Sequence, residues 1–100
     1  MNNLMKQASQ MQAKLTALQS ELDVREIKTS TGGGAIQITI NGKQEIIDLK
    51  LDPECVDPSD VEGFEELLKT GINQAIKESQ DMVSQAMSKV TGGLSIPGLF

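Results

Sequence analysis

The chain has 100 residues, a formal net charge of −5 and no histidine, and its only aromatic side chains are two phenylalanines. A chain of this length forms one small domain, whose core has to be built mainly from aliphatic side chains and methionine. The lack of histidine removes the commonest general base, and no acidic or glycine-rich segment has the spacing of a metal or phosphate loop. We therefore expect no enzyme activity, no catalytic residues, no metal, no cofactor and no small-molecule substrate.

The cellular compartment follows from what the sequence lacks. No apolar run is long enough to span a membrane, and the N-terminus has no signal-peptide hydrophobic region. The single cysteine, Cys55, has no partner for an internal disulfide, which agrees with a reducing compartment. We expect a cytoplasmic protein that makes no membrane contact, with Cys55 serving as a small buried hydrophobe.

The first predicted element is a helix over residues 3–22. Its apolar residues are spaced four and three apart, as in the a/d seam of a coiled coil. A seam this narrow favours packing against one other helix, although a helix lying flat on a sheet is the alternative. The seam consists of Leu4, Ala8, Met11, Leu15, Leu18 and Leu22.

Three antiparallel strands are predicted next, over residues 24–30, 34–40 and 43–51, connected as a meander. Asn41-Gly42 separates the last two strands, and this pair favours a two-residue type I′ turn. Such a turn would place Ile40 opposite Lys43, and the pairs Ile38–Glu45 and Ile36–Ile47 would follow.

One face of this sheet is predicted to be apolar, because side chains alternate along a strand. A lone hairpin is marginal in water, so we expect the flanking helices to cover that face. The apolar face comprises Ile36, Ile38, Ile40, Ile47, Leu49 and Leu51.

The last predicted helix covers residues 58–91, with Asp57 as its N-cap and Pro58 in its first turn. Gly71 inside it indicates either a kink or a close approach of another part of the chain. Its first half, with Phe64, Leu67 and Leu68, is the predicted cover of the sheet. Residues 92–100 form an apolar tail, which is either disordered or docked on another surface.

Charge is distributed unevenly along the chain. If the two helices lie antiparallel, residues 1–15 meet residues 77–91 and form an arm that carries four lysines and two acidic residues, a net charge of +2. The rest of the chain carries five basic and twelve acidic residues, a net charge of −7. The acidic net charge argues against nucleic-acid binding, but any contacts with phosphates would fall on this arm. The alternative is that these lysines are ordinary solvated side chains. The candidate DNA-binding residues are Lys6, Lys14, Lys77 and Lys89.

Several parts of the chain occur in a specific combination: the segment from Gly32 to Lys43, the Leu51-Asp52-Pro53-Glu54 sequence, and the tail Gly92-Gly93-Leu94-Ser95-Ile96-Pro97-Gly98-Leu99. An N-terminal helix rich in Leu, Met and Gln and a long C-terminal helix containing Ala75 and Lys77 accompany them. With these elements in order, the whole chain resembles the YbaB/EbfC family of bacterial nucleoid-associated proteins. The resemblance implies an α+β fold in which an N-terminal helix, a three-stranded antiparallel meander and a long C-terminal helix form a tweezer-like homodimer. It also implies binding of double-stranded DNA, with roles in nucleoid organisation and regulation of gene expression.

The sequence therefore leaves two functions open. The first is a homodimer of single-domain chains, residues 1–100, that binds duplex DNA in the cytoplasmic nucleoid. The alternative is a structural protein–protein interaction module that binds a protein partner through its helical arms or its C-terminal tail. Its support is the acidic net charge and the adaptable methionine-rich helices.

Overall fold

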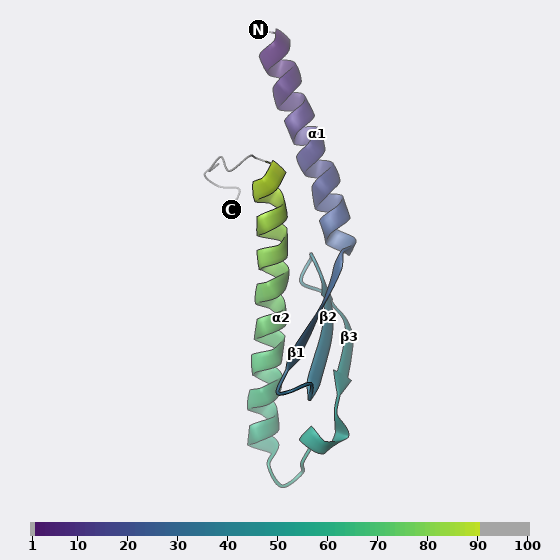
Figure 1. The fold of residues 1–100 in the computed structure, drawn as a ribbon, viewed down its shortest axis with the longest axis vertical. Coiled ribbons are helices and arrows are strands. Elements are labelled where there is room, and N and C mark those ends of the chain that lie inside the picture. Colours follow the sequence, from purple (N-terminus) through teal and green to yellow (C-terminus); the bar gives the residue numbers. More distant parts are fainter. Residues whose placement is uncertain (1, 91–100) are drawn as a thin grey trace.

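The elements of the fold follow one another as the sequence predicts. The computed structural model describes residues 2–90, and the predicted tail, residues 92–100, lies outside them. An N-terminal helix precedes a three-stranded antiparallel sheet, and a long helix follows it, so the α+β class is confirmed (Figure 1). The elements are α1 (Asn2–Val24), β1 (Glu26–Thr31), β2 (Ile36–Asn41), β3 (Ile46–Leu51), the single 3-10 turn η1 (Pro53–Cys55) and α2 (Val61–Val90).

The sheet is the predicted meander, with strand order β1-β2-β3. Its first connection is the triple glycine, in which Gly32, Gly33 and Gly34 have φ angles of 65°, 68° and 95°. Residues with a side chain rarely adopt these left-handed φ angles, whereas glycine adopts them at little cost. The glycines thus reverse the chain between β1 and β2, so that Thr31 pairs with Ile36 and Ile27 with Ile40.

The second connection differs from the predicted type I′ turn. Gln44 N–H donates to the carbonyl oxygen of Asn41, and Gln44, not Gly42, has the positive φ, 60°. The loop therefore has three residues, 42–44, the next commonest hairpin form. The Asn41 carboxamide oxygen holds this loop by accepting the N–H groups of Lys43 and Glu45 at 2.9 and 3.0 Å.

The predicted strand pairing is consequently wrong. Ile36 lies opposite Leu51 and Ile38 opposite Leu49, and a bulge near Ile40 makes Ile46 the partner of Ile40. The true register is displaced by an even number of residues from the predicted one over most of the hairpin. Because faces alternate with a period of two, Leu49 and Leu51 still share a face with Ile36 and Ile38, and the bulge adds Ile46 opposite Ile40.

The core lies between α2 and the first two strands. Ile36, Ile38, Ile40 and Ala75 are buried together. Half-buried residues from α2 and β1 surround them, and they include two of the three predicted to cover the sheet. These are Ile27, Leu67, Leu68, Ile72 and Ile76.

Strand β3 is left outside this core, which corrects the prediction that the flanking helices cover the whole apolar face. Leu49 and Leu51 remain 41% and 37% exposed, and Ile46 and Ile47 are 43% and 51% exposed. Helix α2 lies along β1 and β2, while α1 leaves the sheet at one end (Figure 1). We call these four side chains of β3 the β3 strip.

Helix α2 begins three residues later than predicted. Asp60 is its N-cap: the carboxylate accepts the N–H of Gly63 at 3.1 Å, and the carbonyl accepts that of Phe64. The predicted cap, Asp57, instead closes the preceding turn by accepting the N–H and hydroxyl of Ser59 at 2.9 and 2.7 Å. These hydrogen bonds from Ser59 lower the pKa of Asp57 below its ordinary value.

Gly71 marks a close approach and not a break in the helix, because α2 is continuous from Val61 to Val90. The residue is buried, and a Cβ at this position would lie 3.4 Å from both the Ile36 Cγ2 and the Thr31 Oγ1 atoms. Glycine therefore lets α2 approach β1 and β2 closely.

Candidate nucleic-acid interface

Helix α1 extends away from the sheet as an arm (Figure 1). All its side chains from Asn3 to Lys14 are exposed, including the predicted seam residues Leu4, at 72%, and Met11, at 37%. The seam becomes half-buried at Leu15 and Leu18 and fully buried at Leu22. Within residues 2–90, only the last three of the six seam residues are thus covered.

The base of the arm is fixed where the β2–β3 hairpin loop meets both helices. A Cβ on Gly42 would collide with the carbonyl oxygen of Leu22 and lie 3.3 Å from Val83. Glycine at this position allows the loop to contact the end of α1 directly. The loop therefore lies between the C-terminal end of α1 and helix α2.

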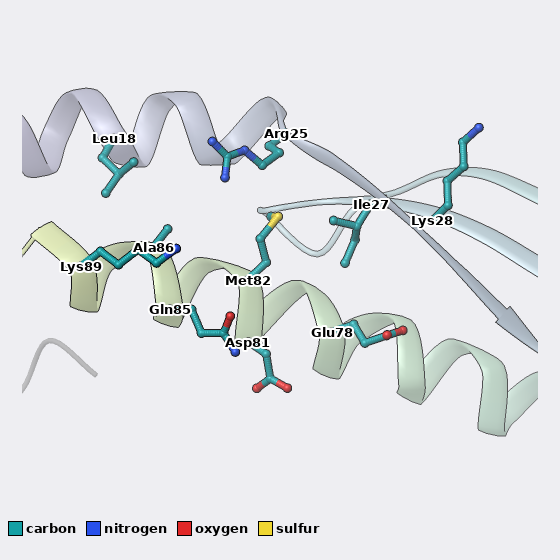
Figure 2. Close-up of a pocket in the computed structure, with 10 residues that line it drawn as sticks. All are labelled: Leu18, Arg25, Ile27, Lys28, Glu78, Asp81, Met82, Gln85, Ala86 and Lys89. Atoms are coloured by element: carbon teal, nitrogen blue, oxygen red, sulfur yellow. The ribbon is translucent and has the colours of Figure 1, made fainter.

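The two helices are antiparallel (Figure 1), as the sequence analysis assumed, but the predicted contact between residues 1–15 and 77–91 is wrong in register. The segment of α1 that faces α2 is its C-terminal part: Leu18 lies across from Ala86, and Met82 lies nearer to Arg25 (Figure 2). The N-terminal part of α1 therefore projects past the end of α2 as a single helix.

A cleft of about 680 Å³ lies between α1 and α2 and reaches the start of β1. Figure 2 shows Leu18 and Met82 pointing into it from opposite helices, with Ile27 at its inner end. Charged and polar side chains surround this apolar floor. They are Arg25, Lys28, Glu78, Asp81, Gln85 and Lys89.

The four candidate lysines are all exposed, and none of them forms an ion pair with any residue in 2–90. Lys6 and Lys14 lie on the projecting part of α1, about 12 Å apart along the helix axis. Lys89 lines the cleft, whereas Lys77 lies about 18 Å further back along α2. The structure therefore places two of these lysines on the projecting helix α1 and two on α2, and does not bring the four together.

Two cations that were not among the predicted site residues, Arg25 and Lys28, line the same cleft as Lys89, and Lys28 lies at its opposite end (Figure 2). Arg25 also pairs with Glu21 at 2.9 Å, one turn away on the surface. Their position directly after the first predicted helix was the available signal, since that junction has to lie at the base of the arm. The acids Glu78 and Asp81 offset part of their positive charge.

Residues 2–90 contain no group of three or more histidine, cysteine, aspartate or glutamate side chains that could hold a metal ion. No helix in this part of the chain is both long enough and apolar enough to cross a membrane. Cys55 is half-buried, with its Sγ atom 3.8 Å from the carbonyl oxygen of Ala35.

These features define a small α+β protein with a projecting helix, whose lysines form no ion pair with any residue in 2–90. The chain belongs to the YbaB/EbfC DNA-binding family, whose model matches residues 1–94. This is a family of DNA-binding proteins and not of enzymes.

Full-length relatives support this membership. A nucleoid-associated protein of Clostridium kluyveri is 49% identical over 100 residues, which cover all of this chain and 88% of the relative. One from Alkaliphilus metalliredigens is 46% identical with the same coverage. One from Desulforamulus reducens is 49% identical, and the match covers 95% of it.

The crystal structure of an uncharacterized protein from Helicobacter pylori has the same fold. It matches with a TM-score of 0.75 over 92% of this chain and 97% of the other. Because the two sequences are only 20% identical, this likeness concerns the fold alone.

Proposed function

We propose that this protein is a nucleoid-associated protein that binds duplex DNA through phosphate contacts from the lysines of its helical arm. The observation that carries the proposal is that Lys6, Lys14, Lys77 and Lys89 are exposed and unpaired within residues 2–90, in a chain of a DNA-binding family. The names of its relatives support a place in the cytoplasmic nucleoid, with roles in nucleoid organisation and regulation of gene expression.

The chemistry of such contacts does not require base recognition. Each lysine that neutralises a phosphate releases a condensed counterion, so affinity depends steeply on salt. Phosphate contacts position a protein on DNA without reading its sequence. The net charge of −5 opposes the approach to DNA, which makes the local concentration of lysines on the arm decisive.

A homodimer is the second part of the proposal, with residues 1–100 of each chain as one unit. The β3 strip and the free seam at Leu4 and Met11 are apolar surfaces exposed in the single chain. Burying apolar surface between two copies is favourable by about 25 cal/mol per Å². Pairing through the β3 strips would join the sheets into a central body and double the number of lysines available to one DNA duplex.

The test compares two lysine-to-alanine variants. The arm variant replaces the four candidate lysines, and the control replaces Lys43, Lys50 and Lys69, which lie outside both the arm and the cleft. The loss of affinity is compared per lysine removed, so that the location of the lost charge decides the outcome. Fluorescence anisotropy with a duplex oligonucleotide is measured from low to high salt.

We expect the arm variant to lose most of its binding, and the slope of log affinity against log salt to fall by about 0.9 for each phosphate contact removed. The control should keep a slope close to that of the wild type. Equal losses per lysine in the two variants would show that the arm has no special role. Full binding by the arm variant would exclude these lysines as the site.

A further inference from the structure

The cleft between α1 and α2 has an apolar floor that residues 2–90 leave open. Leu18, Ile27, Met82 and Ala86 line it and are each only half-buried. These side chains come from three different elements, so the surface is continuous across α1, β1 and α2 (Figure 2). A cleft of about 680 Å³ is within the range of sites that hold a compact ligand of several side chains.

The sequence that follows α2 has the composition to fill this cleft. Residues 91–100 contain no charged side chain and four large apolar ones, Leu94, Ile96, Leu99 and Phe100. Gly92-Gly93 stands directly before them, and two glycines permit a sharp reversal of the chain. Pro97 disfavours helical geometry at Ile96 and favours an extended segment there.

The lengths also agree. Lys89 lines one end of the cleft and Glu78 the other, about 16 Å apart along the helix at 1.5 Å per residue. Residues 94–100 reach about 23 Å when extended. A chain that reverses at the two glycines can therefore run back along α2 for the whole length of the cleft.

We propose that residues 94–100 lie in the α1–α2 cleft of their own chain, with Leu94 and Ile96 on its apolar floor. In an extended segment these two side chains share one face, and Ser95 points the opposite way. The segment then contacts both helices at once and fixes the direction of the projecting arm. This inference is independent of DNA binding, because every contact in it is within one chain.

The test uses the full-length chain with carbon-13 in its methionine methyl groups. The Met82 methyl group lines the cleft, whereas that of Met5 lies on the free part of α1 and serves as a reference. We expect nuclear Overhauser contacts from Met82, and none from Met5, to protons of Ile96, Leu99 or Phe100. The variant Ile96→Ser should shift the Met82 methyl resonance, and the neighbouring variant Ser95→Ala should not.

Mixing the methionine-labelled chains with an excess of fully deuterated chains distinguishes the possible occupants. Contacts from Met82 to tail protons that persist in the mixture support the proposal, because both groups then belong to one chain. Loss of these contacts in the mixture would overturn it and assign the cleft to the tail of a second copy. An unchanged Met82 resonance in Ile96→Ser, together with no contact to the tail, would overturn it as well.

Discussion

The hydroxyl of Ser79 donates a 2.6 Å hydrogen bond to the backbone carbonyl oxygen of Asn41, and Ser79 is completely buried. The same hydroxyl accepts the side-chain amide of Gln44 at 3.2 Å. These two bonds tie α2 to the hairpin loop. Since the loop also contacts the end of α1, they determine how the arm is held relative to the sheet.

Replacing this serine should destabilise the protein. We expect Ser79→Ala to lower the free energy of unfolding by about 0.5–1.5 kcal/mol, the net value of a typical hydrogen bond. Urea denaturation followed by circular dichroism measures it. Ser84→Ala is the control, because Ser84 is exposed on the same helix. Equal stability of the two variants would mean that the buried bond contributes nothing.

The contact between Gly42 and Leu22 predicts a second effect. Gly42→Ala should lower the free energy of unfolding by about 1–3 kcal/mol, the usual effect of overpacking, because the new methyl group collides with the Leu22 carbonyl. Hydrogen exchange should show faster opening of the amides around Leu22.

The control is Gly33→Ala, where φ is 68° and no atom lies within 4 Å of the new Cβ. It should cost about 1–2 kcal/mol through backbone strain and leave exchange in α1 unchanged. If Gly42→Ala and the wild type unfold at the same urea concentration, the close contact between Gly42 and Leu22 does not contribute to stability.

The start of α2 gives a third prediction. Asp60→Ala should lower the free energy of unfolding by about 0.5–2 kcal/mol, the usual cost of losing an N-cap. Asp57→Ala removes the same charge, but the hydrogen bonds that it removes belong to the turn before the helix. It should therefore lower the free energy of unfolding by less than Asp60→Ala does. If urea denaturation shows a larger loss of unfolding free energy in Asp57→Ala than in Asp60→Ala, Asp57 is the N-cap of α2, as the sequence pattern predicts.

The proposed dimer is tested on the β3 strip. Leu49→Glu should give a chain mass close to 10.8 kDa by light scattering at micromolar concentration, and the wild type about twice that mass. Leu49 is 41% exposed in the single chain, so the folded monomer should tolerate the change.

Gln37→Glu is the matched control, because it adds the same side chain to the polar face of the sheet. It should remain dimeric. A dimeric Leu49→Glu variant would exclude the β3 strip as the interface, and a monomeric wild type would exclude the dimer itself.

The sequence by itself determined the elements and their order, since these depend on local preferences. Alternation of Ile36, Ile38 and Ile40 with polar residues defines a strand with one buried face. Three consecutive glycines define a turn that other residues would resist. The exposure of the four candidate lysines was equally predictable, because an unpaired charge is costly to bury.

The tertiary structure decided how these elements meet. Asn41-Gly42 has the composition of a two-residue turn, yet the Asn41 side chain bonds two backbone N–H groups of a three-residue loop, and Gly42 is needed against Leu22. One helix cannot cover three strands, so α2 buries β1 and β2 and leaves β3 exposed. Such choices depend on contacts between residues far apart in the chain, which a local pattern does not contain.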